Sequence, residues 1–178
     1  MSNFYIQVIG FVSFATFASA FYLKTRKQIL AVQIIALVLW SIHYFLLGAV
    51  TGEVLLLIGA ARSFVFYFRK DGNWVNSPFV LCFFLLIVVI SGYLTWNGWV
   101  SIFSVVGVIF ATFSHWQKDP QRLRIVFLPS TLFWFIYNIL VGSYAGLVSE
   151  SVMLVATTGS IIRENIKTKG DKNGKQKM

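Results

Sequence analysis

Long apolar stretches, separated by short polar breaks, follow one another along almost the whole chain. They lack the strict alternation of barrel strands, and each is about as long as a helix that crosses a bilayer. Because lipid offers no hydrogen-bond partner to backbone groups, such segments must be helices. The pattern predicts seven of them: about Phe4 to Leu23, Ile29 to Val50, Glu53 to Phe68, Phe79 to Trp96, Trp99 to Trp116, Ile125 to Tyr144 with an early break at Pro129, and Gly146 to Ile162.

One stretch of the chain occurs in two versions. WSIHYFLLGAVTG begins at Trp40, and WFIYNILVGSYAG begins 94 residues later at Trp134. In each version a long apolar segment ends, and a turn bounded by glycine leads into the next segment. A second match joins FATF at residues 14–17 to FATF at residues 110–113. We therefore predict that segments five to seven repeat segments one to three.

The predicted fold is an all-α membrane protein with seven transmembrane helices in a 3+1+3 parallel repeat. Two three-helix units in the same orientation need an odd number of linking spans, and segment four supplies the minimum of one. The transmembrane domain covers residues 1–163, with repeat one at 4–69, a linker helix at 78–96 and repeat two at 99–163. We expect the basic tail, residues 164–178, to be disordered. Parallel repeats of this kind occur in transporters, with the site between the halves.

The positions of the charged residues predict the orientation in the membrane. The chain has 15 Lys and Arg against 6 Asp and Glu, and every Lys and Arg except Arg62 falls after the end of segment seven or in the connections after segments one, three and five. Such residues collect on the cytoplasmic side, so we expect the N-terminus outside and the C-terminus in the cytoplasm. Ala18-Ser19-Ala20 imitates a signal-peptidase site, but the positive cluster follows this segment, which favours a retained first helix. The scattered charge also argues against nucleic-acid binding.

Arg62 is the most unusual polar residue within a predicted span. It lies roughly 14 Å along the helix from Glu53, near the middle of the bilayer. Ionisable groups at this depth normally face a bundle interior or a water-filled cavity, so Arg62 is a candidate contact for an anion or a hydroxyl group; an inward snorkelling side chain is the alternative. Its candidate partner is Glu150. A polar stripe runs from Glu150 to Thr157, the repeat equivalent of Ser63, and fits either a permeation path or interhelical packing.

Aromatic residues mark the same depth in both halves. Trp40 and Trp134 lie near mid-span, too deep for the interfacial belt. Each is followed at i+3 and i+4 by further residues of the same helix face, which are His43 and Tyr44 in the first half and Tyr137 and Asn138 in the second. Aromatic platforms beside hydrogen-bonding groups suit a sugar-like or other small polar solute. Packing is the alternative for the tryptophans, and for His43 a hydrogen-bonded core role is the alternative to a proton relay.

The sequence contains no constellation typical of catalysis. Paired-carboxylate motifs, nucleophile elbows, metal-ligand spacings and phosphate loops are missing. The single cysteine, Cys82, lies in an apolar run, so neither a disulfide nor a cysteine metal site is available. We expect a protein that is not an enzyme, has no cofactor or metal, contacts the lipid bilayer and is compatible with homo-oligomers.

The chain resembles the YgjV family of bacterial inner-membrane proteins over about residues 8 to 165. In the first half the likeness rests on HYFLLG at 43–48 with Ala61-Arg62, and in the second half on Trp134, Asn138, Gly142-Ser143, Gly146, Glu150 and Ile161-Ile162-Arg163. The layout is similar to that of the SWEET and PQ-loop (MtN3-like) superfamily of sugar, amino-acid and vitamin carriers. The chain departs from those carriers in having one intramembrane proline, Pro129.

Two functions follow as hypotheses. The first is a small transporter of the bacterial inner membrane that binds a neutral or anionic polar solute between the repeats by alternating access. Its candidate binding residues are Trp40, His43, Tyr44, Arg62, Ser63, Trp134, Tyr137, Asn138, Glu150 and Thr157. The second is a receptor, sensor or assembly protein that uses the same fold without transport. Saturable solute flux in liposomes separates the two.

Overall fold

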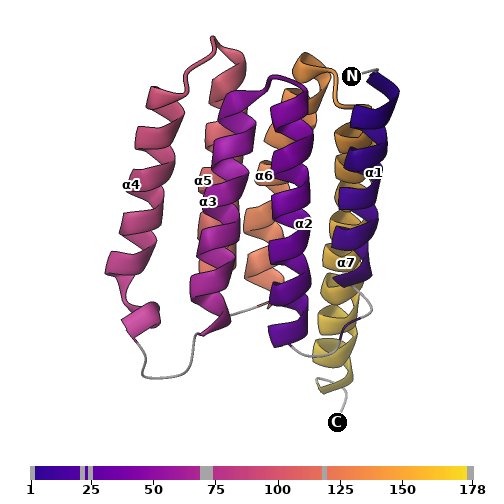
Figure 1. Ribbon diagram of the computed structural model, residues 1–178. Helices are drawn as coiled ribbons and strands as arrows, with labels where there is room; N and C mark the ends of the chain where they lie inside the picture. The colour runs from indigo at the N-terminus through magenta and orange to yellow at the C-terminus, as the bar shows by residue number, and fades with distance from the viewer. Residues whose placement is uncertain (1–2, 21–22, 24–25, 69–73, 118–119, 176–178) are drawn as a thin grey trace.

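The computed structural model describes residues 3–20, 23, 26–68, 74–117 and 120–175. Within this part of the chain the regular structure is helical, as predicted. The helices are α1 (Asn3–Ser19), α2 (Arg26–Leu46), α3 (Val50–Tyr67), α4 (Pro78–Leu94), α5 (Val100–Trp116), α6 (Pro120–Val141) and α7 (Tyr144–Lys175), with the short 3-10 helix η2 (Trp74–Asn76) before α4. Figure 1 shows the seven helices side by side, with the α2–α3, α4–α5 and α6–α7 connections at one end.

Two predicted details differ from the structure. The break at Pro129 is wrong, because α6 begins at Pro120 and continues as one helix through Pro129. Membrane helices tolerate an internal proline where neighbouring helices or side chains satisfy the freed backbone carbonyl. The expected disorder after residue 163 also differs, since α7 continues to Lys175. That stretch contains no proline and is rich in lysine, a good helix former.

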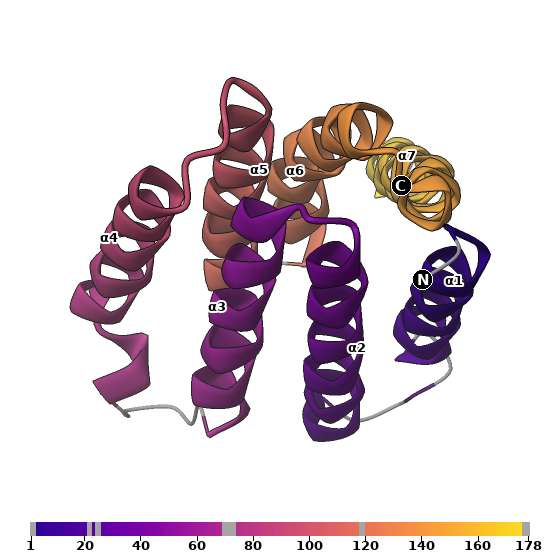
Figure 2. The same cartoon turned by 45° about the horizontal axis from the view of Figure 1, so that its top comes forward.

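Six of the helices form a closed ring around a central axis. Packing contacts join α1 to α2, α2 to α3, α3 to α5, α5 to α6, α6 to α7 and α7 to α1. Helix α4 packs against α3 and α5 from outside the ring, which is visible in Figure 2. The ring order therefore places segments far apart in sequence, α1 and α7, side by side.

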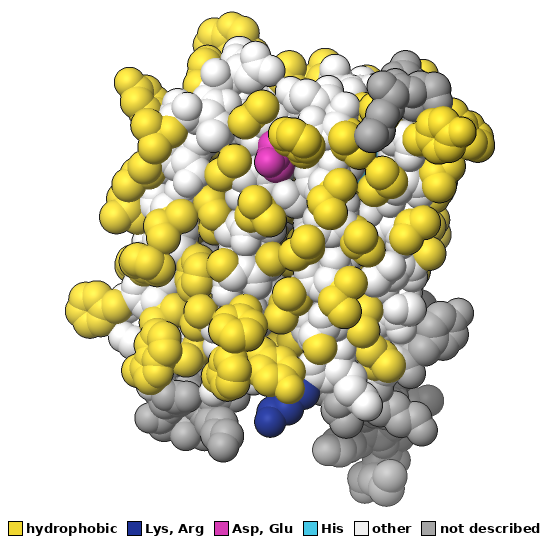
Figure 3. Space-filling view, viewed as in Figure 1, with side chains coloured by type: hydrophobic (Ala, Val, Ile, Leu, Met, Phe, Trp, Pro, Cys, Tyr) yellow, Lys and Arg dark blue, Asp and Glu magenta, His cyan; other side chains and the backbone are white. Residues whose placement is uncertain are grey.

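The outer surface is apolar over most of its area. Figure 3 shows one face covered largely with hydrophobic side chains, with the acidic and basic side chains near the two ends of the helices. On α4, Phe79 and Tyr93 are 82% and 79% exposed. Three helical stretches of the described chain are long and apolar enough to cross a membrane, Val50–Tyr67, Arg122–Val141 and Tyr144–Ile162, and the other apolar helices found there are shorter. An apolar surface of this kind suits contact with lipid rather than water.

The turns at Gly48 and Gly142 have the same geometry. Gly48 has φ of 73° and Gly142 has φ of 70°, in the left-handed region that glycine adopts without strain. After each glycine, the next backbone N–H returns to a carbonyl five residues earlier, from Ala49 to Tyr44 at 2.9 Å and from Ser143 to Asn138 at 3.0 Å. This is the Schellman ending of a helix. We call the end of the bundle that carries these turns the corner end. The opposite end, where the sequence places the Lys and Arg of the connections, is the basic end.

Candidate functional site

A cavity of about 680 Å³ lies inside the ring. Its lining residues come from all six ring helices or from residues directly after α1, and none belongs to α4. Leu23, beyond the end of α1, and Arg124, in the first turns of α6, line it at the basic end. The end of the cavity farthest from the basic end is lined by Tyr44, Trp40 and Trp134. A volume of this size falls in the range of small-molecule sites, about 300–1,000 Å³.

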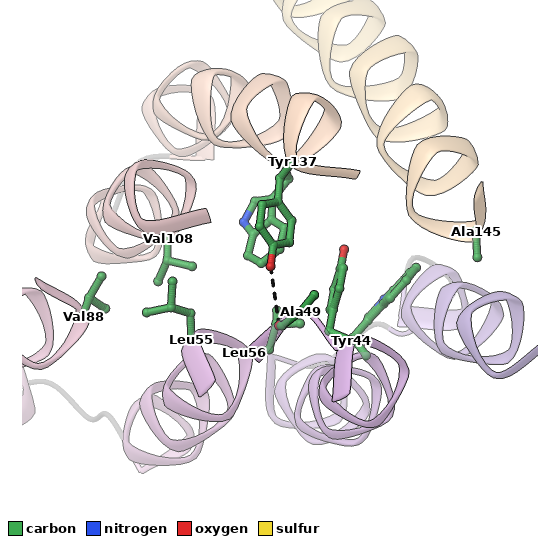
Figure 4. Close-up of a cluster of buried hydrophobic side chains, with 10 residues drawn as sticks. Tyr44, Ala49, Leu55, Leu56, Val88, Val108, Tyr137 and Ala145 are labelled. Atoms are coloured by element: carbon green, nitrogen blue, oxygen red, sulfur yellow. Dashed lines mark hydrogen bonds between the residues drawn. The ribbon is translucent and has the colours of Figure 1, made fainter. Parts of the chain in front are cut away.

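The cavity stops at a layer of four aromatic side chains, Trp40, Tyr44, Trp134 and Tyr137, which we call the aromatic layer. The Tyr44 ring lies with its centroid 5.9 Å from that of Trp40, 5.7 Å from Trp134 and 5.7 Å from Tyr137. Each member of the layer is at most 8% exposed. Figure 4 shows Tyr44 and Tyr137 pointing from their helices toward the middle of the ring. The layer therefore fills the axis where the cavity ends.

Hydrogen bonds across the aromatic layer connect the two halves of the chain. The Tyr44 hydroxyl donates to Asn138 Oδ1 at 2.6 Å. The Tyr137 hydroxyl accepts from the backbone N–H of Gly52 at 3.1 Å and donates to the Ala49 carbonyl at 3.5 Å, the dashed line in Figure 4. A Cβ added at Gly52 would lie 2.6 Å from the Tyr137 hydroxyl oxygen, so the absence of a side chain permits this contact. Helices α2, α3 and α6 are thus held together through buried polar groups.

His43 lies behind the aromatic layer and does not line the cavity. Its Nδ1 is 2.8 Å from the Ile6 carbonyl, and its Nε2 is 2.8 Å from Ser143 Oγ. Because a carbonyl can only accept, Nδ1 carries the proton, and Nε2 of the neutral ring accepts from the Ser143 hydroxyl. Ser143 Oγ in turn accepts from the Gly146 N–H at 3.1 Å. His43 therefore joins α1, α2 and the α6–α7 turn.

Each corner turn is also held by a helix from the other half of the chain. Gln7 of α1 donates to the Gly142 carbonyl at 3.0 Å and accepts from the Ala145 N–H at 3.1 Å. Ser101 of α5 lies 2.9 Å, hydroxyl to hydroxyl, from Thr51 at the start of α3. A second cavity of about 300 Å³ lies at this end, lined in part by Thr51, Ser101 and Tyr137. Tyr137 of the aromatic layer thus lines this second cavity and not the large one.

Arg62 lines the large cavity and is 4% exposed. Its Nη1 donates to the Thr112 hydroxyl of α5, and that hydroxyl donates to the Val108 carbonyl at 2.7 Å. Glu150 lines the same cavity but interacts electrostatically with the Tyr44 hydroxyl at the aromatic layer. The direct ion pair that we considered for Arg62 and Glu150 is not formed. Arg62 sits on the seam between α3 and α5 instead.

The structure gathers the predicted residues around one axis but at two depths. Seven of the ten line the large cavity: Trp40, Tyr44, Arg62, Ser63, Trp134, Glu150 and Thr157. The remaining three lie in or beside the layer that closes it, and these are His43, Tyr137 and Asn138. Whether a solute contacts them stays a prediction.

The sequence reasoning missed the partners of these residues. Thr112 belongs to the repeated FATF motif, and its counterpart Thr16 makes the same bond four residues back, to Val12, at 2.8 Å. The repeat therefore offered a signal for Thr112. His115, which lines the cavity one turn later, and Gln7 had no comparable signal.

A ring of apolar-surfaced helices around an axial cavity, itself mostly apolar with a few polar groups, defines a multi-pass helical membrane protein. The family described as Imp-YgjV, bacterial inner membrane protein, matches residues 4–168, and the chain belongs to this family. The chain is similar to the inner membrane protein YgjV of Escherichia coli (strain K12), with 23% identity over 157 residues that cover 88% of this chain and 82% of that protein. No solved structure matches the chain. The expected family and the inner-membrane location are confirmed.

Proposed function

We propose that the protein is a small-solute transporter that works by alternating access. The observation that carries this proposal is the one-sided cavity: it extends from the basic end into the ring and stops at the aromatic layer. A carrier needs a central site that one barrier separates from one side of the membrane. The solute is moved without covalent change, and the structure is the form open toward the basic end.

All seven helices cross the membrane in this proposal, with the basic end in the cytoplasm. The shortest, such as the 17-residue α1 and α4, span about 26 Å at about 1.5 Å per residue. That length is a little less than a hydrocarbon core of about 30 Å, and local thinning or flanking residues accommodate the difference. The excess of Lys and Arg at the basic end supports the orientation.

The six ring helices act as two repeats, α1–α3 and α5–α7, linked by α4. Three features support this part of the proposal: the matched corner turns, the repeated FATF motif and the ring order. In that order the last helix of each repeat packs against the first helix of the other, α3 against α5 and α7 against α1. The two contacts between the repeats are therefore of the same kind. Rocking of one repeat against the other about the central axis opens one end as it closes the other, as in other carriers built from parallel repeats. We include in this proposal the similarity of layout to the SWEET superfamily, in which two three-helix repeats are linked by a single helix.

The solute site lies between the aromatic layer and Arg62. Trp40, Tyr44 and Trp134 supply flat apolar surfaces, and Glu150, Ser63 and Thr157 supply polar groups along the wall. A few polar groups in a mostly apolar cavity are typical of sites that orient one class of small molecule.

Flux into proteoliposomes tests the proposal. Purified protein is reconstituted, and uptake of radiolabelled glucose, alanine and benzoate is measured against protein-free liposomes. We expect saturable uptake of at least one solute, reduced severalfold by Trp134→Phe, which shrinks the aromatic surface of the cavity wall. Trp99→Phe is the matched control, because Trp99 is 79% exposed. Uptake equal to that of empty liposomes for all three solutes would contradict transport and favour the receptor hypothesis.

A further inference from the structure

Arg62 is a buried cation with few partners. Its side chain is 4% exposed, and of its five N–H donors the Nη1 group bonds to the Thr112 hydroxyl. Nε has no hydrogen-bond partner. A buried donor without an acceptor is costly, and more so on a charged group. The guanidinium is therefore incompletely satisfied as the structure stands.

Among the residues that the structure describes, no acidic side chain forms an ion pair with Arg62. The structure holds no ion pair between Arg62 and Glu150, the acid that also lines this cavity. A titratable neighbour across the seam is His115 of α5, which interacts electrostatically with Arg62 and bonds through Nδ1 to the Ala111 carbonyl at 2.6 Å. A buried charge without a counter-ion is strongly unfavourable, so an anion from outside the chain would be stabilised here.

The other residues of the cavity wall limit which kind of molecule can carry the negatively charged group. Leu56 belongs to the same core cluster as the aromatic layer, and Arg62 follows it six residues later, about 9 Å along the helix at about 1.5 Å per residue. The cavity wall is mostly apolar and includes Leu56, Gly59 and Met153. Glu150, which interacts with the Tyr44 hydroxyl of the aromatic layer, offers a hydrogen-bonding group at that end of the cavity, so Arg62 is the site for a negative charge. A solute is thus oriented with its negative end toward Arg62.

We propose that Arg62 is the anchor for the carboxylate of a small organic acid whose apolar or aromatic body lies against Trp40, Tyr44 and Trp134. The inference rests on the proposed function, because this acid would be the solute carried. A guanidinium presents paired donors in a plane that matches a carboxylate, which a point charge does not. Thr112 is the positioning residue, since its hydroxyl holds one side of the guanidinium and leaves the other free.

Binding to the full-length protein in detergent tests the anchor. The probes are 4-phenylbutyrate and its uncharged analogue 4-phenylbutanol, and affinity is measured by the concentration dependence of the unfolding temperature. We expect the carboxylate to bind at least tenfold more tightly than the alcohol. Equal affinity for the two probes overturns the proposal with the wild-type protein alone, even if no variant folds.

Variants then assign the effect to Arg62. Arg62→Gln should weaken 4-phenylbutyrate binding at least tenfold and leave 4-phenylbutanol unchanged, and Arg62→Lys should fall between, because it keeps the charge and loses the planar fork. Arg124→Gln is the matched control. It removes the same charge from the mouth of the same cavity and should weaken binding less than threefold. Equal losses for Arg62→Gln and Arg124→Gln would mean general electrostatic attraction and would overturn the anchor.

Three further results separate this inference from the alternatives and from the proposed function. If chloride or sulfate at the same concentration stabilises the protein as well as 4-phenylbutyrate, and Arg62→Gln abolishes the effect, the site takes inorganic anions and the organic acid is wrong. If the carboxylate binds through Arg62 but does not cross proteoliposomes, the anchor stands and transport fails. If glucose is transported and the carboxylate does not bind, transport stands and the anchor fails.

Discussion

The corner end and the basic end of the same ring are built differently. At the corner end the axis is filled by the aromatic layer, and hydrogen bonds from His43, Tyr44 and Tyr137 connect helices of both halves. At the basic end a cavity of about 680 Å³ occupies the axis, and Arg62 bonds to Thr112 on one seam.

In the proposed transport cycle, this difference places the energy barrier to opening at the corner end. The same six helices surround both ends, so the ring order alone does not distinguish the two ends. Buried polar groups do: each must keep its partner, because an unsatisfied buried group costs about 1–3 kcal/mol. If the protein alternates as proposed, the corner end opens only when several of these bonds are exchanged together for others, which is the behaviour expected of a barrier with two discrete states.

The largest effect is expected at Gly146, where a helix of the second half approaches Asn138. A Cβ there would lie 2.0 Å from Asn138 Oδ1, the atom that accepts from Tyr44. Gly146→Ala should lower the free energy of unfolding by about 3 kcal/mol through overpacking. Gly159→Ala in the same helix is the control, because nothing lies within 4 Å of its Cβ, and it should be neutral or stabilising. Thermal unfolding in detergent compares the two, and equal effects would refute tight packing at this corner.

His43→Ala is expected to cause the second-largest loss in the free energy of unfolding. It leaves the Ile6 carbonyl and the Ser143 hydroxyl without their partner and creates a void, with a loss of about 2 kcal/mol. Ser143→Ala should cost less, because it removes one of the two bonds and leaves little space. If the double variant loses the sum of the two single losses, His43 and Ser143 are not coupled and the proposed bridge is absent.

Tyr44→Phe removes one hydroxyl from the aromatic layer and should cost about 1 kcal/mol, since Asn138 Oδ1 loses its donor. The informative readout is accessibility. With one bond across the layer gone, a cysteine below the layer should react faster with a reagent from the corner side. Unchanged reactivity from that side would show that this bond is not part of the barrier. Tyr93→Phe, on the exposed surface of α4, is the control.

The smallest effects are expected from substitutions at the two corner-turn glycines, and they test whether the two turns are equivalent. Gly48→Ala and Gly142→Ala each place a side chain at positive φ with open space around it, so the cost is conformational and about 1 kcal/mol in both. Thermal unfolding should give the same loss at the two sites. A difference above about 1 kcal/mol would contradict the equivalence of the turns on which the repeat rests.

The sequence predicted much of the helical arrangement and less of the contacts. Hydropathy located all seven helices, and the repeated glycines located both corner turns, because span length and left-handed φ are local properties of the chain. The ring order and the partner of Arg62 are not local. They depend on how helices rotate and pack, so Glu150 was an equally reasonable partner until the structure placed Thr112 beside Arg62. Lipid-facing and cavity-facing tryptophans are likewise indistinguishable by hydropathy, and both Trp40 and Trp134 line the cavity.

The most direct test of the account measures which side of the membrane reaches the large cavity. Ser149 lines this cavity and is 4% exposed, so Ser149→Cys is a nearly isosteric probe. The variant is made in a Cys82→Ala background, because Cys82 is exposed. A membrane-impermeant thiol reagent is applied to inverted inner-membrane vesicles and to spheroplasts, with Asn97→Cys at the exposed corner end as the orientation control. We expect Ser149→Cys to react at least tenfold faster in inverted vesicles than in spheroplasts. Faster reaction in spheroplasts, or no reaction in either preparation, would contradict a cavity that is open to the cytoplasm and closed at the corner end.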